Sequence, residues 1–297
     1  ASLPLYKDHQ EDGNYSIQMP PGADNGRLYT FNCTHQDPVL REIFQNPKFS
    51  QAMSLAMDRE EINQVLCYGY LRPSGFSLSH SSPYYSEPIS QLYAKYDPEK
   101  SRTLLDQAGY IDSDGDGYRE LEDGSRFQLT IDIMGGVRLT DICELIAEYW
   151  DAIGIKVHLY IALQEIVVPR RLNGEYDITV ANTPTHPLTQ SHQYGIVGPN
   201  LPFWHRNAAT EGPDWLIEVT RLIEKAKTTM APEKRGENLI QIRDLMTENI
   251  PFICIGAEVK IWGNNTRVGN TPKLISVEDL YRDFSRTVAH EQLFIRE

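Results

Sequence analysis

The sequence predicts an α/β fold in which a mixed sheet is flanked by helices, and three consecutive segments carry this prediction. Residues 127–134, FQLTIDIM, alternate apolar and polar side chains as a strand does. Residues 141–152 then place apolar side chains on one helical face, and residues 155–162, IKVHLYIA, return to a strand pattern. A strand, a helix and a strand in this order form a right-handed βαβ unit, so part of the sheet is expected to be parallel.

Helix and strand signals also precede this unit. A strand is expected over residues 27–32, RLYTFN, and a helix over residues 49–57, FSQAMSLAM. Asp58 is an N-cap candidate, and Glu61 three residues later completes a capping box for a second helix. Asp97 caps a third helix, because the proline after it suits the first helical position.

Predicted helices and strands continue to alternate in the second half of the chain. A short helix with Pro169 near its start ends at Gly174, and residues 176–182, YDITVAN, form the next predicted strand. Residues 183–213 show no periodic pattern, and a loop of that length in a compact domain is usually functional. The remaining predicted elements are two amphipathic helices and one buried strand: residues 214–230, 232–249 and 250–256.

Composition narrows the class of protein. The 297 residues carry a formal net charge of −13, which disfavours a nucleic-acid partner because phosphate is repelled. No apolar run reaches the ~20 residues that span a bilayer. The first ten residues, ASLPLYKDHQ, lack the basic and apolar pattern of a secretory signal. The four cysteines are scattered without CxxC pairing, so we expect small buried apolar residues rather than a zinc site: Cys33, Cys67, Cys143 and Cys254.

The stretch DSDGDGYRELED, residues 112–123, has the ligand spacing of a calcium loop. Carboxylates fall at loop positions one, three, five, nine and twelve, and Gly117 suits the sharp turn at position six. The candidate calcium ligands are therefore Asp112, Asp114, Asp116, Glu120 and Asp123. The loop joins a helix to a strand, which excludes the paired helices of a calcium sensor. Two interpretations stay open: a static calcium clip, and a turn satisfied by its own backbone hydrogen bonds.

No motif indicates an enzyme. The sequence contains no GxSxG nucleophile elbow and neither of the glycine-rich phosphate loops, GxGxxG and GxxxxGK[ST]. Three histidines of the long loop are either metal ligands or polar loop residues: His186, His192 and His205. Aromatic residues of this loop and of an earlier Ser/Pro-rich segment are either stacking platforms for a ligand or buried anchors: Tyr84, Tyr85, Tyr194, Phe203 and Trp204.

Several stretches, in order and spacing, resemble segments of one family, the family 5 extracellular solute-binding proteins. FQNPKFSQAMSLAMDREEINQVLCYG resembles the family's segment with a D-R-E-E-I core, and YDPEKSRTLLDQAGY its Tyr-Asp-Pro-Glu-Lys helix. EYWDAIGIKVHL is similar to its helix-to-strand step, LNGEYDITVAN to its G-x-Y-D strand and IPFICIG to its I-P-hydrophobic strand. The DSDGDGYRE loop is frequent in one branch of the family. The resemblance runs from about Tyr29 to Ile255.

The resemblance implies a type II periplasmic-binding-protein-like fold, of which this chain would be the C-terminal portion only. Residues 38–249 would form the C-terminal ligand-binding lobe, residues 1–37 would lead from an N-terminal lobe, and residues 250–297 would return to it. Such proteins are the binding components of ABC importers. The resemblance therefore implies a non-enzymatic, monomeric, extracytoplasmic protein that works with a membrane permease, and whose export signal is absent from this chain.

The resemblance further implies a solute held between two lobes, and an oligopeptide is the first expectation. An oligosaccharide is the alternative, because His186 stands about where peptide-binding members carry an Asp for the peptide α-amine. The expected ligand contacts are Asn182, Thr183, Thr185, His186, Tyr194, Trp204, Arg138, Met134, Phe31 and Phe76. A hydrolase acting on peptides or glycans is the alternative from another class, and calcium is the one cofactor considered.

Overall fold

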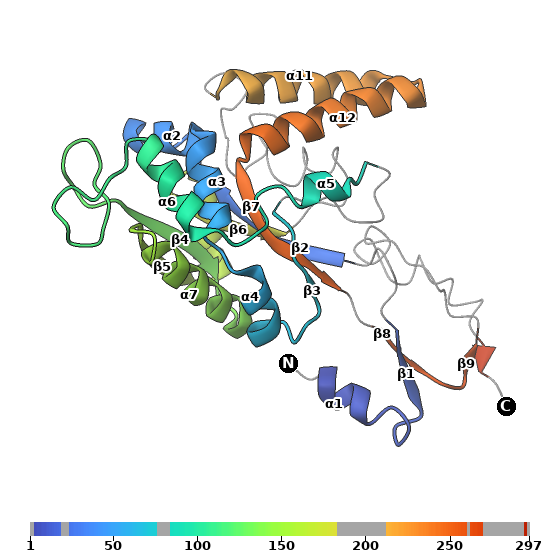
Figure 1. Ribbon diagram of the computed structural model, residues 1–297. Coiled ribbons are helices and arrows are strands. Elements are labelled where there is room, and N and C mark those ends of the chain that lie inside the picture. Colours follow the sequence, from blue (N-terminus) through green and yellow to red (C-terminus); the bar gives the residue numbers. More distant parts are fainter. Residues whose placement is uncertain are drawn as a thin grey trace.

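The computed structural model describes residues 3–18, 24–75, 84–182, 212–259, 262–269 and 294–295 (Figure 1). Its helices are α1 (Leu3–Asp8), α2 (Pro38–Gln45), α3 (Pro47–Leu55), α4 (Arg59–Leu66), α5 (Glu87–Ser90), α6 (Pro98–Gln107), α7 (Val137–Asp151), α8 (Gln164–Asn173), α11 (Asp214–Thr228) and α12 (Pro232–Asn249). Its strands are β1 (Tyr15–Gln18), β2 (Asp24–Phe31), β3 (Leu71–Arg72), β4 (Gln128–Met134), β5 (Lys156–Ala162), β6 (Ile178–Asn182), β7 (Phe252–Val259), β8 (Trp262–Asn265), β9 (Val268–Gly269) and β10 (Phe294–Ile295).

The largest sheet within these described ranges has six strands in the order β3-β7-β2-β6-β4-β5. Strand β4 runs parallel to β5 and β6, whereas β2 is antiparallel to both of its neighbours, β6 and β7. The sheet is therefore mixed, and β4, α7 and β5 form the predicted βαβ unit. The α/β fold class and the mixed sheet flanked by helices are confirmed.

Helices cover both faces of this sheet, which gives a three-layer structure (Figure 1). Alternate residues of β2 serve the two faces, because successive strand side chains point to opposite sides. Tyr29 joins the apolar cluster with α2, α3, α4, α6 and α7, and its ring meets the edge of Trp150 at 6.4 Å between centroids. Leu28 joins a second cluster with α11 and α12. Both clusters are contiguous and apolar, so each face has a core of its own.

Two inner strands of the sheet come from the ends of the chain. The predicted lobe, residues 38–249, leaves out β2 and β7, yet Phe31 and Ile253 lie in the same apolar cluster as Ile131. The sheet therefore extends beyond the predicted lobe at both ends, because long-range strand pairing leaves no local signal in the sequence. Strands β1 and β8 form a separate antiparallel pair, with Tyr15 opposite Asn265. The chain thus passes twice between the six-stranded sheet and this smaller pair.

Helix starts follow the sequence where a polar side chain caps them. Asp58 Oδ1 accepts hydrogen bonds from the backbone N of Glu60 and Glu61 at 3.1 and 3.0 Å. The Glu61 side chain accepts from the Tyr149 hydroxyl at 2.6 Å, so its carboxylate is used across helices. The N-terminal ends of α7 and α8 have no side-chain cap, which explains why α7 begins before residue 141. Pro169 lies inside α8 rather than near its start.

A buried arginine joins segments that lie far apart in the sequence. Arg59 is 2 % exposed, and its guanidinium donates to the carbonyls of Ser54 (2.8 Å), Ala94 (3.0 Å) and Cys254 (2.8 Å). Burial lowers the pKa of Arg59 to about 10. Ser54 belongs to the last turn of α3, where carbonyl dipoles favour a cation. Arg59 therefore ties α3, the segment before α6 and β7 together.

The four cysteines lie in the interior of the protein. All four cysteine side chains are buried, as expected for small apolar residues, and burial raises the pKa of Cys33 and Cys143 to about 12. Over the described residues, no helix has both the length and the apolar character that a membrane crossing needs.

Candidate functional site

Strands β4, β5, β6 and β7 all end at one edge of the six-stranded sheet, which we call the carboxyl edge. Met134 pairs with Ala162 at the last position of β4 and β5, and Arg27 of β2 lies opposite Asn182, the last residue of β6. Because β2 runs in the reverse direction, its start lies at the same edge, opposite the end of β7. Strands β1 and β8 form their own pair apart from this sheet (Figure 1). Carboxyl ends of strands are where α/β sheets commonly hold ligands.

The predicted contacts Met134 and Arg138 lie at the carboxyl edge. Gly135, directly after β4, donates its backbone N to the Ala162 carbonyl at 3.1 Å, which holds the turn against the end of β5. Met134 is partly buried, while Arg138 is exposed in the first turn of α7. Val137 beside it is 83 % exposed. The turn therefore presents side chains to whatever approaches this edge, and their role as ligand contacts stays a prediction.

Other predicted contacts fall in two groups. Asn182 ends β6 at the carboxyl edge. Thr183, Thr185, His186, Tyr194, Trp204 and Phe76 lie outside the described residues.

Phe31 differs from the prediction. It pairs with Ile178 at the far end of β6, is 0 % exposed, and its ring packs against Phe44 and Phe49 at centroid distances of 5.9 and 5.3 Å. The structure thus assigns Phe31 to the core rather than to the ligand contacts, because a ring without exposed surface at the opposite end of the strand does not reach the edge.

A buried polar row crosses the sheet beneath the carboxyl edge. Thr30, Thr179 and Asp132 occupy neighbouring positions on β2, β6 and β4, and each is at most 1 % exposed. Arg170 of α8 donates from Nε to Asp132 Oδ2 at 2.9 Å, and its guanidinium lies 4.7 Å from the centroid of the Tyr160 ring. These polar residues were not among the sequence candidates.

Burial and the neighbouring positive charge have opposite effects on the pKa of Asp132. Burial raises the pKa of Asp132, and the neighbouring Arg170 only partly offsets that effect. The hydrogen bond to Asp132 raises the pKa of Arg170, which is about one third exposed and stays charged. The pair thus holds a carboxylate in the protein interior with one cationic partner at its surface side.

The G-x-Y-D stretch has a structural role. Gly174 ends α8 with a positive φ of 69°, a conformation that glycine adopts without strain. Asn32 donates from Nδ2 to the carbonyls of Gly174 and Tyr176 at 3.0 and 2.8 Å. Asp177 accepts from the backbone N of Thr130 at 2.8 Å, so the motif joins α8, β2 and β4. It positions the start of β6, which ends at the carboxyl edge.

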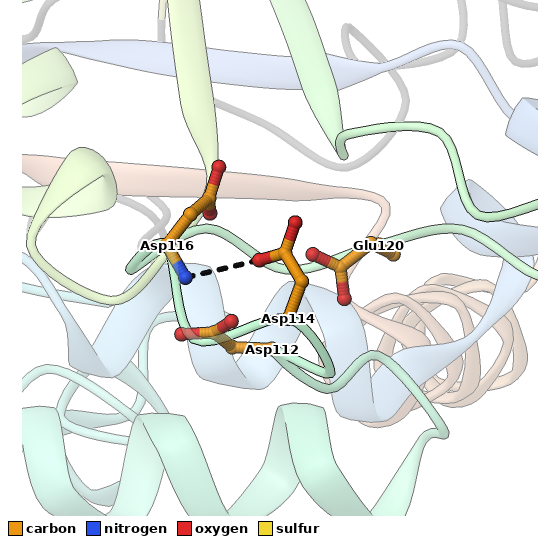
Figure 2. A group of neighbouring side chains, drawn as sticks. All are labelled: Asp112, Asp114, Asp116 and Glu120. Carbon is orange, nitrogen blue, oxygen red and sulfur yellow. Dashed lines mark hydrogen bonds between the residues drawn. The ribbon is translucent and has the colours of Figure 1, made fainter.

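The acidic loop lies elsewhere, between α6 and β4. Asp112, Asp114, Asp116 and Glu120 each offer a carboxylate oxygen, and these atoms all lie within 4.8 Å of one another (Figure 2). The backbone N of Gly117 donates to Asp112 Oδ2 at 3.0 Å, and the backbone N of Asp116 to Asp114 Oδ1 at 3.0 Å. Four hard oxygen donors at this spacing suit a single calcium ion.

Asp123, the fifth predicted ligand, lies outside this group. Its Oδ1 accepts from the backbone N and the hydroxyl of Ser125 at 2.9 and 2.6 Å. These hydrogen bonds hold the pKa of Asp123 below its usual range. The chain turns after Glu120, which forms an isolated β-bridge with Arg126, and this turn separates position twelve from the other four carboxylates. The predicted ligand set is therefore corrected to four residues.

Arg119 anchors the acidic loop to the lobe. It is 6 % exposed, and its guanidinium donates to the Ile153 carbonyl at 2.8 Å, to Asp106 Oδ1 at 2.6 Å and to the Tyr110 carbonyl. Its backbone N donates to the Gly154 carbonyl at 2.8 Å. At this loop position a calcium sensor carries a small apolar residue, so Arg119 marks a loop fixed to its own domain.

The mixed six-stranded sheet with helices on both faces is a periplasmic-binding-protein-like fold. The model of the bacterial extracellular solute-binding proteins, family 5, matches residues 2–197, and the chain belongs to that family.

The chain matches two relatives over only part of their length. The oligopeptide-binding protein AppA of Bacillus subtilis is 25% identical over 218 residues, which are 71% of this chain and 38% of that protein. The periplasmic alpha-galactoside-binding protein of Rhizobium meliloti is 23% identical over 282 residues, which are 86% of this chain and 38% of that protein. The chain thus spans well under half the length of these relatives.

Two solved structures of similar fold are likewise matched over about half of their length. The oligopeptide-binding protein OppA superposes with a TM-score of 0.85 at 26% identity, covering 99% of this chain and 51% of that chain. The binding protein MelB from Agrobacterium fabrum, solved with stachyose, superposes with a TM-score of 0.80 at 18% identity, covering 99% of this chain and 47% of that chain. The second likeness, at this identity, shows the fold alone.

Proposed function

We propose that the chain is one lobe of the solute-binding component of an ABC importer, and that the complete protein binds an oligopeptide between two lobes. The observation that carries the proposal is that β2 begins and β7 ends side by side at the carboxyl edge, while β1 and β8 pair with each other. If two neighbouring strands join two lobes at such an edge, one lobe can rotate against the other as a hinge. Family membership supports this reading, since family 5 is a family of extracellular solute-binding proteins.

The mechanism follows from differential binding. A solute that touches both lobes stabilises the closed arrangement, because only that arrangement makes all the contacts. A membrane permease that recognises the closed form would then receive the solute. The same proposal places the protein outside the cytoplasm as a monomer without catalytic activity. The relatives support the binding role, since they are named as binding proteins, and one of them is named as periplasmic.

Oligopeptide and oligosaccharide are the two solute classes to separate. The similarity to AppA and OppA supports an oligopeptide, and that to the alpha-galactoside-binding protein supports an oligosaccharide. Thermal unfolding of the complete protein with each class of solute separates them. A ligand at 100 times its Kd adds about 2.7 kcal/mol of stability, so Tm rises with the right class by several degrees.

This chain by itself provides the control. We expect it to fold, because it has a core on each face of its sheet, and to bind solute weakly, because one side of the chamber is missing. Micromolar binding of a solute by this chain alone, measured by calorimetry, contradicts the two-lobed proposal. Turnover of a chromogenic peptide or glycan analogue favours the hydrolase alternative instead.

His186 offers a sharper test of the solute class. An ammonium group binds a carboxylate far more strongly than a neutral imidazole. In the complete protein, His186→Asp should therefore raise the affinity for peptides with a free α-amine about tenfold, a change of ~1.4 kcal/mol. His192→Asp adds the same charge to the same loop and should leave the affinity within twofold. Equal gains from both variants mean that general charge, not position, is responsible.

A calcium clip in the acidic loop is a second proposal, supported by the four clustered carboxylates. Adding millimolar calcium to the chelated protein should raise Tm by a few degrees, because binding to the folded state alone stabilises it. Asp114→Asn should remove that rise. Asp123→Asn is the matched control and should keep it, since its carboxylate is turned to Ser125. A Tm that calcium and chelator leave unchanged dismisses the clip.

A further inference from the structure

The buried polar row of Thr30, Thr179 and Asp132 contains more polar atoms than its protein partners satisfy. Within the described parts of the chain, Thr30 Oγ1, Thr179 Oγ1 and Asp132 Oδ1 are buried without a hydrogen-bond partner. Arg171 Nε is also buried without a hydrogen-bond partner, whereas Arg171 Nη2 donates to the Val180 carbonyl at 2.9 Å. Buried polar atoms are almost always paired, by protein or by ordered water, so each of these four atoms needs a partner.

Strand register brings three of these atoms together. Thr30 lies directly opposite Thr179 across the β2–β6 pair, and Asp132 lies beside Thr179 across the β4–β6 pair. Side chains at such positions have Cβ atoms about 5 Å apart and share one face of the sheet. Arg171 reaches the row from α8, because its bond to Val180 ends on the residue next to Thr179. Thr179 and Asp132 are therefore direct neighbours, and Thr30 lies two strands away from Asp132.

The hydrogen-bonding capacities of Thr179, Asp132 and Arg171 match those of one water molecule. Asp132 Oδ1 accepts, Arg171 Nε–H donates, and each threonine hydroxyl does either. A water donates two hydrogen bonds and accepts two, and buried waters make about three on average. We propose that the row binds an ordered internal water, held between Thr179 Oγ1 and Asp132 Oδ1, with Arg171 Nε as its third partner.

This water would complete the shell of the buried carboxylate. Asp132 Oδ2 accepts from Arg170, and the water would donate to Oδ1, so both oxygens would be satisfied. Arg170 in turn lies over the Tyr160 ring on the edge strand β5. The water thus helps to fix α8 against the sheet beneath the carboxyl edge. The inference stands independently of the solute, because it uses only groups inside the lobe.

The direct test is a crystal structure of the protein at a resolution that shows ordered waters. We expect density within hydrogen-bonding distance of both Thr179 Oγ1 and Asp132 Oδ1. Thr179→Ser, which keeps the hydroxyl, should retain that density, and Thr179→Val should lose it. The proposal is overturned if the wild type shows no density there and the threonine hydroxyls bond to backbone carbonyls instead.

The sign of a stability change gives a second test. Removing an unsatisfied hydroxyl from a dry site is neutral or stabilising, whereas removing a water ligand leaves Asp132 Oδ1 with a weaker partner. We therefore expect Thr179→Val to lower Tm by a few degrees. Ser50→Ala is the control: its hydroxyl is also buried and unpartnered, but lies on α3, and Tm should stay equal or rise. A Tm that rises in Thr179→Val contradicts the water site.

Discussion

The two faces of the six-stranded sheet differ in how they treat buried polarity. On the face covered by α3 and α7, the inner strands contribute apolar side chains such as Tyr29, Ile131 and Ile178. On the opposite face the same strands contribute Thr30, Asp132 and Thr179, and the charged Arg170 reaches in from α8. The comparison teaches that one face is apolar throughout, while the other combines an apolar core under α11 and α12 with a polar layer under α8.

The largest effect is expected on the apolar face. Trp150 is 0 % exposed, and its indole N donates to the Met53 carbonyl at 2.9 Å. Trp150→Ala should reduce the free energy of unfolding by about 4 kcal/mol, because it leaves a large cavity in a packed core. Denaturant unfolding measures the loss. Val137→Ala, at a position 83 % exposed, is the control and should change the stability by less than ~0.5 kcal/mol.

A smaller effect is expected when the ion pair of the polar face is broken. Arg170→Ala leaves Asp132 buried without its cation, and we expect a loss of about 2 kcal/mol, below the usual range because Arg170 is partly exposed. The double variant Asp132→Leu with Arg170→Met removes both charges and should recover most of that loss. If the double variant is as unstable as the single one, the polar layer is more than an isolated ion pair.

The smallest effect is a pH dependence on the same face. Burial raises the pKa of Asp132, so between its unfolded and folded pKa values the native state binds more protons than the unfolded state. Stability from this group is therefore present at low pH and is lost as pH rises through the folded pKa. Relative to Asp132→Asn, the wild type should lose unfolding free energy as pH rises from about 4, the ordinary pKa of an Asp side chain, towards neutral pH. A constant difference across this window means that Arg170 fully offsets the burial.

Local patterns predicted elements well where a cap or a period was visible. The βαβ unit, the capped starts of α4 and α6, and the start of α11 and α12 follow from such signals. The start of α7 was misplaced, since this helix begins at Val137 after Gly136, which has no side chain to cap it. Pro169 was expected near the start of its helix, yet it lies in the middle of α8.

The candidate site was only partly predictable. The calcium spacing identified four clustered carboxylates, because loop ligands are close in sequence. Asp123, the fifth predicted ligand, lies apart from these four because the chain turns at the β-bridge after Glu120. Asp132 was missed for a different reason: in an amphipathic strand pattern a polar residue between two apolar ones faces solvent, but here helices cover both faces.

The sequence by itself determined the class of fold, the acidic loop and the family, because each depends on residues near one another along the chain. Only the tertiary structure decided that β2 and β7 enter the sheet from both ends of the chain, and that Thr30, Thr179 and Asp132 form one row. Strand neighbours more than a hundred residues apart are selected by the fit of whole faces during folding. No local pattern records which residues that fit will bring together.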